Sequence, residues 1–363
     1  MKRMGKSAAA VFRAPPERVR TGDSSYAYRQ SSDLYYLTGL VEPDSALVLR
    51  TAGPAASMVL FVRRRDPERE VWDGRRVGIE GAVERLGAGV AYAIEELPAK
   101  LPELVANADD LYFSLGVDPS FDSKVCATLA HLRAAERKIG RPPKRVVDPR
   151  TVLHEMRLIK SPEEIAALVR AAAITERAFV EAMRGVNPGM YEYELQAVVE
   201  YHFRSQGATG PGYTTIVGAG NNATTLHYVE NDARIEADQL VLIDAGAEFQ
   251  FYTADVTRTF PAGGRFSAPQ RRVYDAVLAA QKEAIALVRP GASIDAIHRR
   301  VVEMLTQSAI DLGLLRGSVG ELVETEAYKK YYMHRTSHWL GMDVHDVGAY
   351  LADDGSARPL AAG

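Results

Sequence analysis

The sequence predicts a chain of two domains, an α/β domain at the N-terminus followed by an α+β domain. Its 363 residues are enough for two domains of about 100–150 residues each. Up to about residue 145, short strand-like runs are mixed with helical patterns, whereas beyond residue 160 strands and helices come in separate blocks. We therefore expect an N-terminal domain over residues 1–145, a linker over 146–160 and a second domain over 161–363.

The elements of the N-terminal domain are predicted from local patterns. Ala46–Arg50 and Met58–Val62 are short apolar runs with β-branched or aromatic side chains, which is typical of strands. Apolar residues recur at helical spacing over residues 123–139 and predict a helix. Residues 140–148 are rich in proline and charge, so we expect the domain to end there.

The second domain opens with a clear helix start. Ser161 is a suitable cap, Pro162 suits the first helical position, and Glu164 completes a capping box. The predicted buried face of this helix consists of Ile165, Leu168, Val169, Ala172 and Phe179. Further helices are expected over 191–203 and after serine caps at Ser267 and Ser293, with strands near 213–217, 240–245 and 255–260.

Composition excludes several classes of protein. Hydrophobic residues make up 47% and charged residues 25%, as in globular proteins, and the net charge of −3 argues against a nucleic-acid partner. The apolar run over residues 8–12 is too short for a secretory signal, and no run reaches the ~20 residues of a membrane span. The single cysteine, Cys126, is interpreted as a buried thiol in a reducing compartment. We expect a soluble cytoplasmic protein.

Two acidic residues mark the first candidate site. Asp244 ends one strand-like run and Asp255 begins the next. A hairpin with a tight loop at Phe249 and Gln250 would place the two carboxylates directly opposite each other. Like charges in that position destabilise a sheet, and a pair of metal ions about 3.5–4 Å apart would relieve the repulsion. The alternative is two separate, solvated carboxylates at strand ends.

Histidines mark the second candidate site. His334, His338 and His345 fall within residues 333–348, and histidine is the commonest metal ligand. A spacing of four places His334 and His338 on one face of either a helix or a strand. No glutamate follows His334, so this is not the zinc-protease signature. The alternative is a surface loop that happens to contain histidines.

Three further features have simpler explanations. His227 is isolated, and a lone histidine is more often structural than catalytic. Residues 218–223 fit the G-x-G-x-x-A dinucleotide pattern, but the Asn- and Thr-rich stretch that follows is a poor helix, so turn glycines are favoured. His298, beside two arginines, is expected on an exposed helix face.

These motifs also resemble a known family. IDAGAEFQFYTADVTRTFP resembles the metal-binding hairpin of the pita-bread metallopeptidases, and MHRTSHWLGMDVHDVG is similar to the histidine segment of their aminopeptidase P branch. Residues 23–40, 71–78, 152–165 and 224–232 fit the same branch, so the resemblance covers nearly the whole chain. It implies an N-terminal creatinase/aminopeptidase P-like domain and a pita-bread catalytic domain.

The resemblance implies a role for each matching residue. Asp244 would bind one metal ion, Asp255 would bridge two, and His338 would bind the other. The catalytic and substrate-binding histidines would be His227, His334 and His345. Trp72 is similar to a tryptophan that reaches the site of a neighbouring subunit and would bind substrate there.

The implied activity is that of an Xaa-Pro aminopeptidase. A hydroxide held by two divalent ions, manganese with cobalt or zinc as substitutes, would cleave peptides that have proline at the second position. A homo-oligomer, either dimer or tetramer, is implied as well. Proline dipeptidase is the nearest alternative, and a metal-free binding protein on the same scaffold is another.

One part of the family pattern has no match here. The family's two glutamate ligands lie in V-E-P-G-like and I-E-D-D-like motifs, and residues 324–326 match neither. We therefore expect a C-terminally truncated chain whose catalytic domain is incomplete. Such a chain would bind metal weakly and have little activity.

Overall fold

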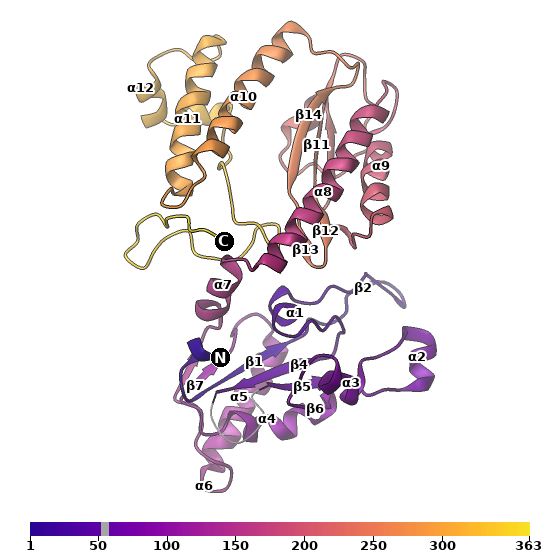
Figure 1. Cartoon of the computed structure of the whole chain (residues 1–363), viewed down its shortest axis with the longest axis vertical. Helices are drawn as coiled ribbons and strands as arrows, with labels where there is room; N and C mark the ends of the chain where they lie inside the picture. The colour runs from indigo at the N-terminus through magenta and orange to yellow at the C-terminus, as the bar shows by residue number, and fades with distance from the viewer. Residues whose placement is uncertain (52–57) are drawn as a thin grey trace. The chain divides into compact units, whose positions relative to one another are not determined.

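The computed structural model describes residues 1–51 and 58–363, which form two compact units, Met1–His154 and Glu155–Gly363 (Figure 1). The α/β class predicted for the first and the α+β class predicted for the second are both confirmed. None of the helices in the described part has the length and apolar character that crossing a bilayer requires.

A six-stranded sheet forms the centre of the first unit. Its order is β6-β5-β4-β1-β7-β8, with β4 antiparallel to both neighbours and the other pairs parallel. The strands are β1 (Ala8–Arg13), β4 (Ala46–Arg50), β5 (Met58–Val62), β6 (Val90–Ala93), β7 (Asp110–Tyr112) and β8 (Arg145–Val147). A separate pair is formed by β2 (Val19–Thr21) and β3 (Ser24–Ser25).

Helices cover both faces of this sheet. Val48 and Phe61 pack on the face covered by α4 and α5, whereas Leu47 and Leu60 pack on the face covered by α1 and α3. Both faces are therefore buried, which is why these strands are continuous apolar runs rather than alternating ones. The helices of this unit are α1 (Ser32–Thr38), α2 (Pro67–Asp73), α3 (Gly78–Glu84), α4 (Leu97–Val105), α5 (Pro119–Ala134) and α6 (Glu136–Ile139).

Three sequence predictions for this region change. The helix predicted over 123–139 begins at Pro119, after an Asp118 cap, and is interrupted at Ala135. Cys126 is exposed rather than buried, because it lies on the solvent side of α5. The segment predicted as a linker over 146–160 contains the end of β8 and helix α7 (Arg150–Leu158), so most of it is regular structure.

In the second unit, two helices pack on a three-stranded antiparallel sheet of order β10-β11-β14. Ala178 on α8 and Val199 on α9 meet Val217 and Ile243 of the sheet. The capping box at Ser161 is present as predicted, as are the serine caps at Ser267 and Ser293. The elements are α8 (Pro162–Gly185), α9 (Glu192–Ser205), α10 (Ala268–Leu287), α11 (Ile294–Asp311), α12 (Val319–Glu324), β9 (Gly210–Pro211), β10 (Ile216–Ala219), β11 (Leu240–Ala245), β12 (Ala247–Phe249), β13 (Tyr252–Thr253) and β14 (Val256–Pro261).

The buried face predicted for α8 is partly wrong. Phe179 is buried, but Ile165 and Val169 are 42% and 62% exposed. The buried stripe consists instead of Ala167, Ala171, Ile174, Thr175, Ala178, Phe179 and Ala182. Because apolar residues occur all around this helix, its pattern does not single out one face. The small alanines turn toward the sheet and α9, where they allow close packing.

Candidate metal centre

The β11–β14 hairpin carries the two predicted carboxylates, in a register that differs from the prediction. Asp244 pairs with Thr257 rather than lying opposite Asp255, which directly precedes β14. The loop lies one residue later than predicted, at Gln250 and Phe251, which both have positive φ. Moving the loop by one residue shifts the pairing by two positions, so both carboxylates stay on the same face.

The two carboxylates converge on a tyrosine hydroxyl. The Tyr213 hydroxyl lies 2.6 Å from Oδ1 of Asp244 and 2.9 Å from Oδ1 of Asp255, and it has one proton to donate. Burial raises the pKa of Asp244, and the neighbouring charge of Asp255 adds to the effect. Two adjacent, partly buried carboxylates repel each other, and a cation bound between them would offset the repulsion.

His338 approaches the same carboxylates from the histidine segment. Its Nε2 lies 3.0 Å from Oδ2 of Asp255, and its Nδ1 lies 2.8 Å from the carbonyl oxygen of Trp339. When Nδ1 donates to that carbonyl, the lone pair of Nε2 points at Asp255 unless His338 is protonated. A backbone carbonyl that fixes the imidazole in this way is a common feature of metal-binding histidines.

The chemistry of these donors fits a divalent ion. Carboxylate oxygens and one imidazole suit manganese, with zinc and cobalt as substitutes. As the side chains stand, however, no group of three His, Cys, Asp or Glu residues in 1–51 and 58–363 is arranged to enclose an ion. The Tyr213 hydroxyl lies between the carboxylates, and His338 is bonded to Asp255 directly.

The structure gathers the other predicted histidines around the same cavity. Its volume is about 470 Å³, and it is lined by Asp244, Asp255, His338, His227, His334 and His345. The ring of His345 lies 4.4 Å from that of His338 in an edge-on arrangement. Trp72, in contrast, lies on α2 of the first unit, is 85% exposed and does not line this cavity.

Buried charges hold the histidine segment, which has neither helix nor strand between residues 333 and 348. The Asp346 carboxylate, whose side chain is 1% exposed, accepts from Arg157 at 2.7 Å and from Lys160 at 2.9 Å. Arg157 also reaches Asp343 at 2.8 Å. Arg157 and Lys160 lie nearly two hundred residues before the carboxylates with which they form these ion pairs, so no local sequence pattern predicts the contacts.

Hydrogen bonds of Thr336 also attach the histidine segment to α11. Thr336 lies between two groups, with its hydroxyl 2.8 Å from Nδ1 of His298 and 2.6 Å from the Tyr332 hydroxyl. His298 is therefore partly buried and bonded, rather than on the exposed face that we predicted. Burial, together with the charge of nearby Arg335, lowers the pKa of His298.

The loop that carries His227 is held by a fully buried carboxylate. Glu192 Oε1 accepts from the Ala219 amide and the Asn222 side chain, and its Oε2 accepts from the Tyr228 hydroxyl and the Ala233 amide. Burial and the bond to Glu192 raise the pKa of Tyr228 to about 12. Sequence reasoning missed this residue, because a glutamate at the start of a helix is normally solvated.

The G-x-G-x-x-A stretch forms a tight turn at the start of this loop. A Cβ added to Gly218 would lie 2.8 Å from the amide nitrogen of Ala223, so the glycine permits close packing. The turn that follows is a 3₁₀ helix of five residues, Gly220–Thr224. The amide of Ala219, directly before this turn, is bonded to Glu192, which supports turn glycines over a dinucleotide site.

Comparison with known families covers both units. Residues 1–112 match the family described as "Aminopeptidase P, N-terminal domain". Residues 166–363 match "Metallopeptidase family M24", which is more than half of the chain.

Individual relatives and solved structures of the same family are similar to this chain over nearly its whole length. The chain is 43% identical to the Xaa-Pro aminopeptidase of Escherichia coli, over 97% of this chain and 80% of the relative. The structure of the Pseudomonas aeruginosa aminopeptidase PepP is similar at a TM-score of 0.97 and 43% identity, over 99% of this chain and 81% of the other. A zinc-substituted E. coli aminopeptidase P in complex with product is similar at a TM-score of 0.94 and 43% identity, over 98% and 80% of the two chains.

Proposed function

Because this chain belongs to metallopeptidase family M24, we propose that it acts as an Xaa-Pro aminopeptidase, which releases the N-terminal residue that precedes a proline. One observation carries the proposal: the adjacent carboxylates of Asp244 and Asp255 meet the imidazole of His338, 83 residues beyond Asp255, at one cavity. Membership of the family implies divalent metal ions. We propose that the ions are two manganese ions.

The three ligating residues are proposed to hold these ions at the end of the hairpin. Asp255 would bridge, while Asp244 and His338 would each hold one ion. When bound, such a pair lowers the pKa of a shared water and makes hydroxide available near neutral pH. The Tyr213 hydroxyl, now between the carboxylates, would give way or remain bonded to one of their outer oxygens.

The histidines on the cavity wall are proposed to handle the peptide. His227, His334 and His345 are exposed in the cavity, where they can meet a substrate. Nδ1 of His334 lies 2.7 Å from the carbonyl oxygen of Arg335, which leaves its Nε2 for the substrate. Donors there would stabilise the negative charge that develops on the scissile carbonyl oxygen and carry protons to the leaving proline nitrogen. The substrate's free amine would lie beside the carboxylates, which restricts cleavage to the N-terminus.

Several finer points belong to the same proposal. Trp72 would reach the cavity of a neighbouring subunit in a homo-oligomer, and its high exposure in the single chain is consistent with a role between subunits. The cytoplasmic location and the dimer or tetramer stay predictions.

Peptide length separates this proposal from proline dipeptidase. We expect cleavage of an Xaa-Pro-Yaa tripeptide in the presence of manganese, with little cleavage of the Xaa-Pro dipeptide. The reverse preference would favour the dipeptidase. A metal-free binding role is opposed by the convergence of Asp244 and Asp255, because a binding protein gains nothing from adjacent, partly buried carboxylates.

The assay is sharpened by a matched pair of variants in the protein that contains these 363 residues. Asp255→Asn should remove bound manganese and lower tripeptide cleavage by about 10³-fold or more. Asp238→Asn changes an exposed aspartate outside the cavity and should preserve both the manganese content and the tripeptide cleavage. Metal content is measured by mass spectrometry of the purified proteins. Full manganese content and activity in Asp255→Asn would rule out the proposed centre.

A further inference from the structure

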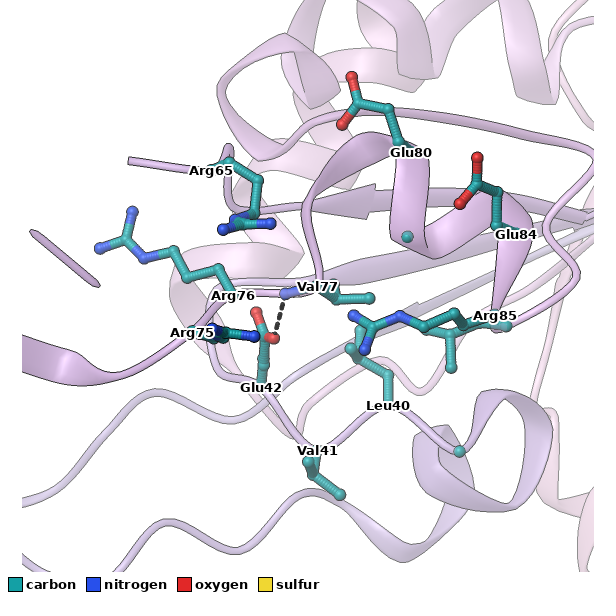
Figure 2. A pocket seen from close by; sticks show the side chains of 13 residues that line it. Leu40, Val41, Glu42, Arg65, Arg75, Arg76, Val77, Glu80, Glu84 and Arg85 are labelled. Carbon is teal, nitrogen blue, oxygen red and sulfur yellow. Dashed lines mark hydrogen bonds between the residues drawn. The ribbon is translucent and has the colours of Figure 1, made fainter. Parts of the chain in front are cut away.

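A second cavity lies in the first unit and has no part in the metal centre. Its volume is about 500 Å³, and it is bounded by residues 39–42, Arg65 and residues 75–77, 80–81 and 84–86 (Figure 2). Four arginines line it: Arg65, Arg75, Arg76 and Arg85. Such a concentration of guanidinium groups around one cavity suggests an anionic ligand.

Within the described residues, the side chains of two of the four arginines have no partner. Arg65 is bonded to Glu70, and Arg76 donates to the carbonyl oxygen of Arg64. The guanidinium groups of Arg75 and Arg85, by contrast, have no hydrogen bond or ion pair to any residue in 1–51 or 58–363. In addition, Nε of Arg76 is buried without a partner. The cavity therefore offers unused donors, one of them already removed from water.

The nearby carboxylates do not neutralise these donors. Glu42 lies among the arginines, but its Oε1 accepts from the Val77 amide and its Oε2 lies 3.6 Å from the guanidinium of Arg63. Figure 2 shows the carboxylates of Glu80 and Glu84 directed away from Glu42 and Arg75. Although Glu42, Glu80 and Glu84 also line the cavity, none of them forms an ion pair with Arg75 or Arg85 among the described residues, so these two guanidinium groups remain available to an anion.

Local glycines place two of the arginine side chains. Gly78 has φ of +67°, and a Cβ there would lie 2.5 Å from Cγ of Arg65. A Cβ on Gly81 would lie 3.0 Å from Nη2 of Arg85. Both arginine side chains thus pass directly over a glycine.

Apolar side chains complete the lining. Leu40, Val41, Val77 and Leu86 lie beside the guanidinium groups, so a ligand with only charge would leave part of the cavity unfilled. We propose that this cavity binds an organic carboxylate carried on a short apolar body, such as the carboxyl end of a peptide. Arg75 and Arg85 bind the carboxylate, and the leucine and valine side chains pack against the apolar part.

N-acetyl-leucine is a suitable probe, because it has the carboxylate and the apolar body but no free amine for the metal centre. Its binding is measured by calorimetry and by the rise in melting temperature that a ligand of the folded state produces. We expect binding that weakens as salt is added. N-acetyl-leucine amide, which lacks the charge, and inorganic phosphate, which lacks the apolar body, should both bind at least about tenfold more weakly.

Variants assign the binding to this cavity. The double variant Arg75→Ala/Arg85→Ala should weaken N-acetyl-leucine binding by about tenfold or more, whereas Arg133→Ala/Arg137→Ala removes the same charge from exposed positions outside the cavity and should not. The four substituted arginines are all exposed, so both double variants should have the melting temperature of the parent protein when no ligand is present. Equal binding in the Arg75/Arg85 variant, equal binding of the amide, or tighter binding of phosphate would each overturn the proposal.

Discussion

The proposed metal centre joins two regions of one unit that are held in place by different forces. The carboxylates lie on or next to the strands of the β11–β14 hairpin, where backbone hydrogen bonds set the register. The histidines lie on residues 333–348, which have no regular structure and depend on side chains of other elements. Positions on the hairpin should therefore respond to changes in the backbone, whereas positions on the histidine segment should respond to the loss of single distant side chains.

The largest effect is expected from Asp346, because it balances two buried cations. Asp346→Ala would leave Arg157 and Lys160 without their shared partner, which should lower the free energy of unfolding by about 3–5 kcal/mol. The same substitution at exposed Asp238 should change it by less than about 0.5 kcal/mol. Urea denaturation monitored by circular dichroism measures both. A small effect at Asp346 would mean that the histidine segment does not depend on this ion pair.

A glycine in the hairpin tests the role of the backbone. A Cβ on Gly246 would lie 1.6 Å from the carbonyl oxygen of Ala254, so Gly246→Ala should force the strands apart and cost about 3 kcal/mol. Gly185→Ala, at a position with open space, should be neutral or slightly stabilising. Thermal unfolding and manganese content are the measurements. If Gly246→Ala kept full stability and metal, the hairpin would be more adaptable than its register suggests.

Glu192 allows the His227 loop to be disturbed without a change in volume. Glu192→Gln replaces an acceptor with a donor opposite either Tyr228 and Ala233 or Ala219 and Asn222, which should cost about 2 kcal/mol. The loop should become more mobile, and hydrogen exchange of residues 219–233 should speed up while that of the hairpin does not. Uniform acceleration across the unit would instead indicate a general loss of stability.

The smallest effect is expected at Thr336. Thr336→Val removes the hydroxyl that joins His298 to Tyr332 and should cost about 1 kcal/mol, while Thr336→Ser should retain most of the stability. If Thr336 positions its neighbours His334 and His338, valine should also lower kcat several-fold with a smaller change in KM, and serine should restore it. Equal kinetics in the two variants would limit Thr336 to a structural role.

The hairpin was the more predictable of the two regions. Its strands follow from short apolar runs, and the common face of Asp244 and Asp255 follows from the two-residue period, which survives the shift in register. The loop position was not predictable, because Gln250 and Phe251 adopt positive φ without a glycine to signal it. For the histidine segment, the sequence predicted which residues take part but not how they are arranged in space.

The sequence by itself determined the strands, the capped helices, the two fold classes and the residues that form the cavity, because these depend on neighbours along the chain or on recognisable motifs. Only the tertiary structure decided which face of α8 is buried, that Cys126 is exposed, and that Arg157, Lys160 and Glu192 support the site. A buried charge is tolerated only where partners meet it, and those partners come from segments whose separation in the sequence gives no sign of their contact.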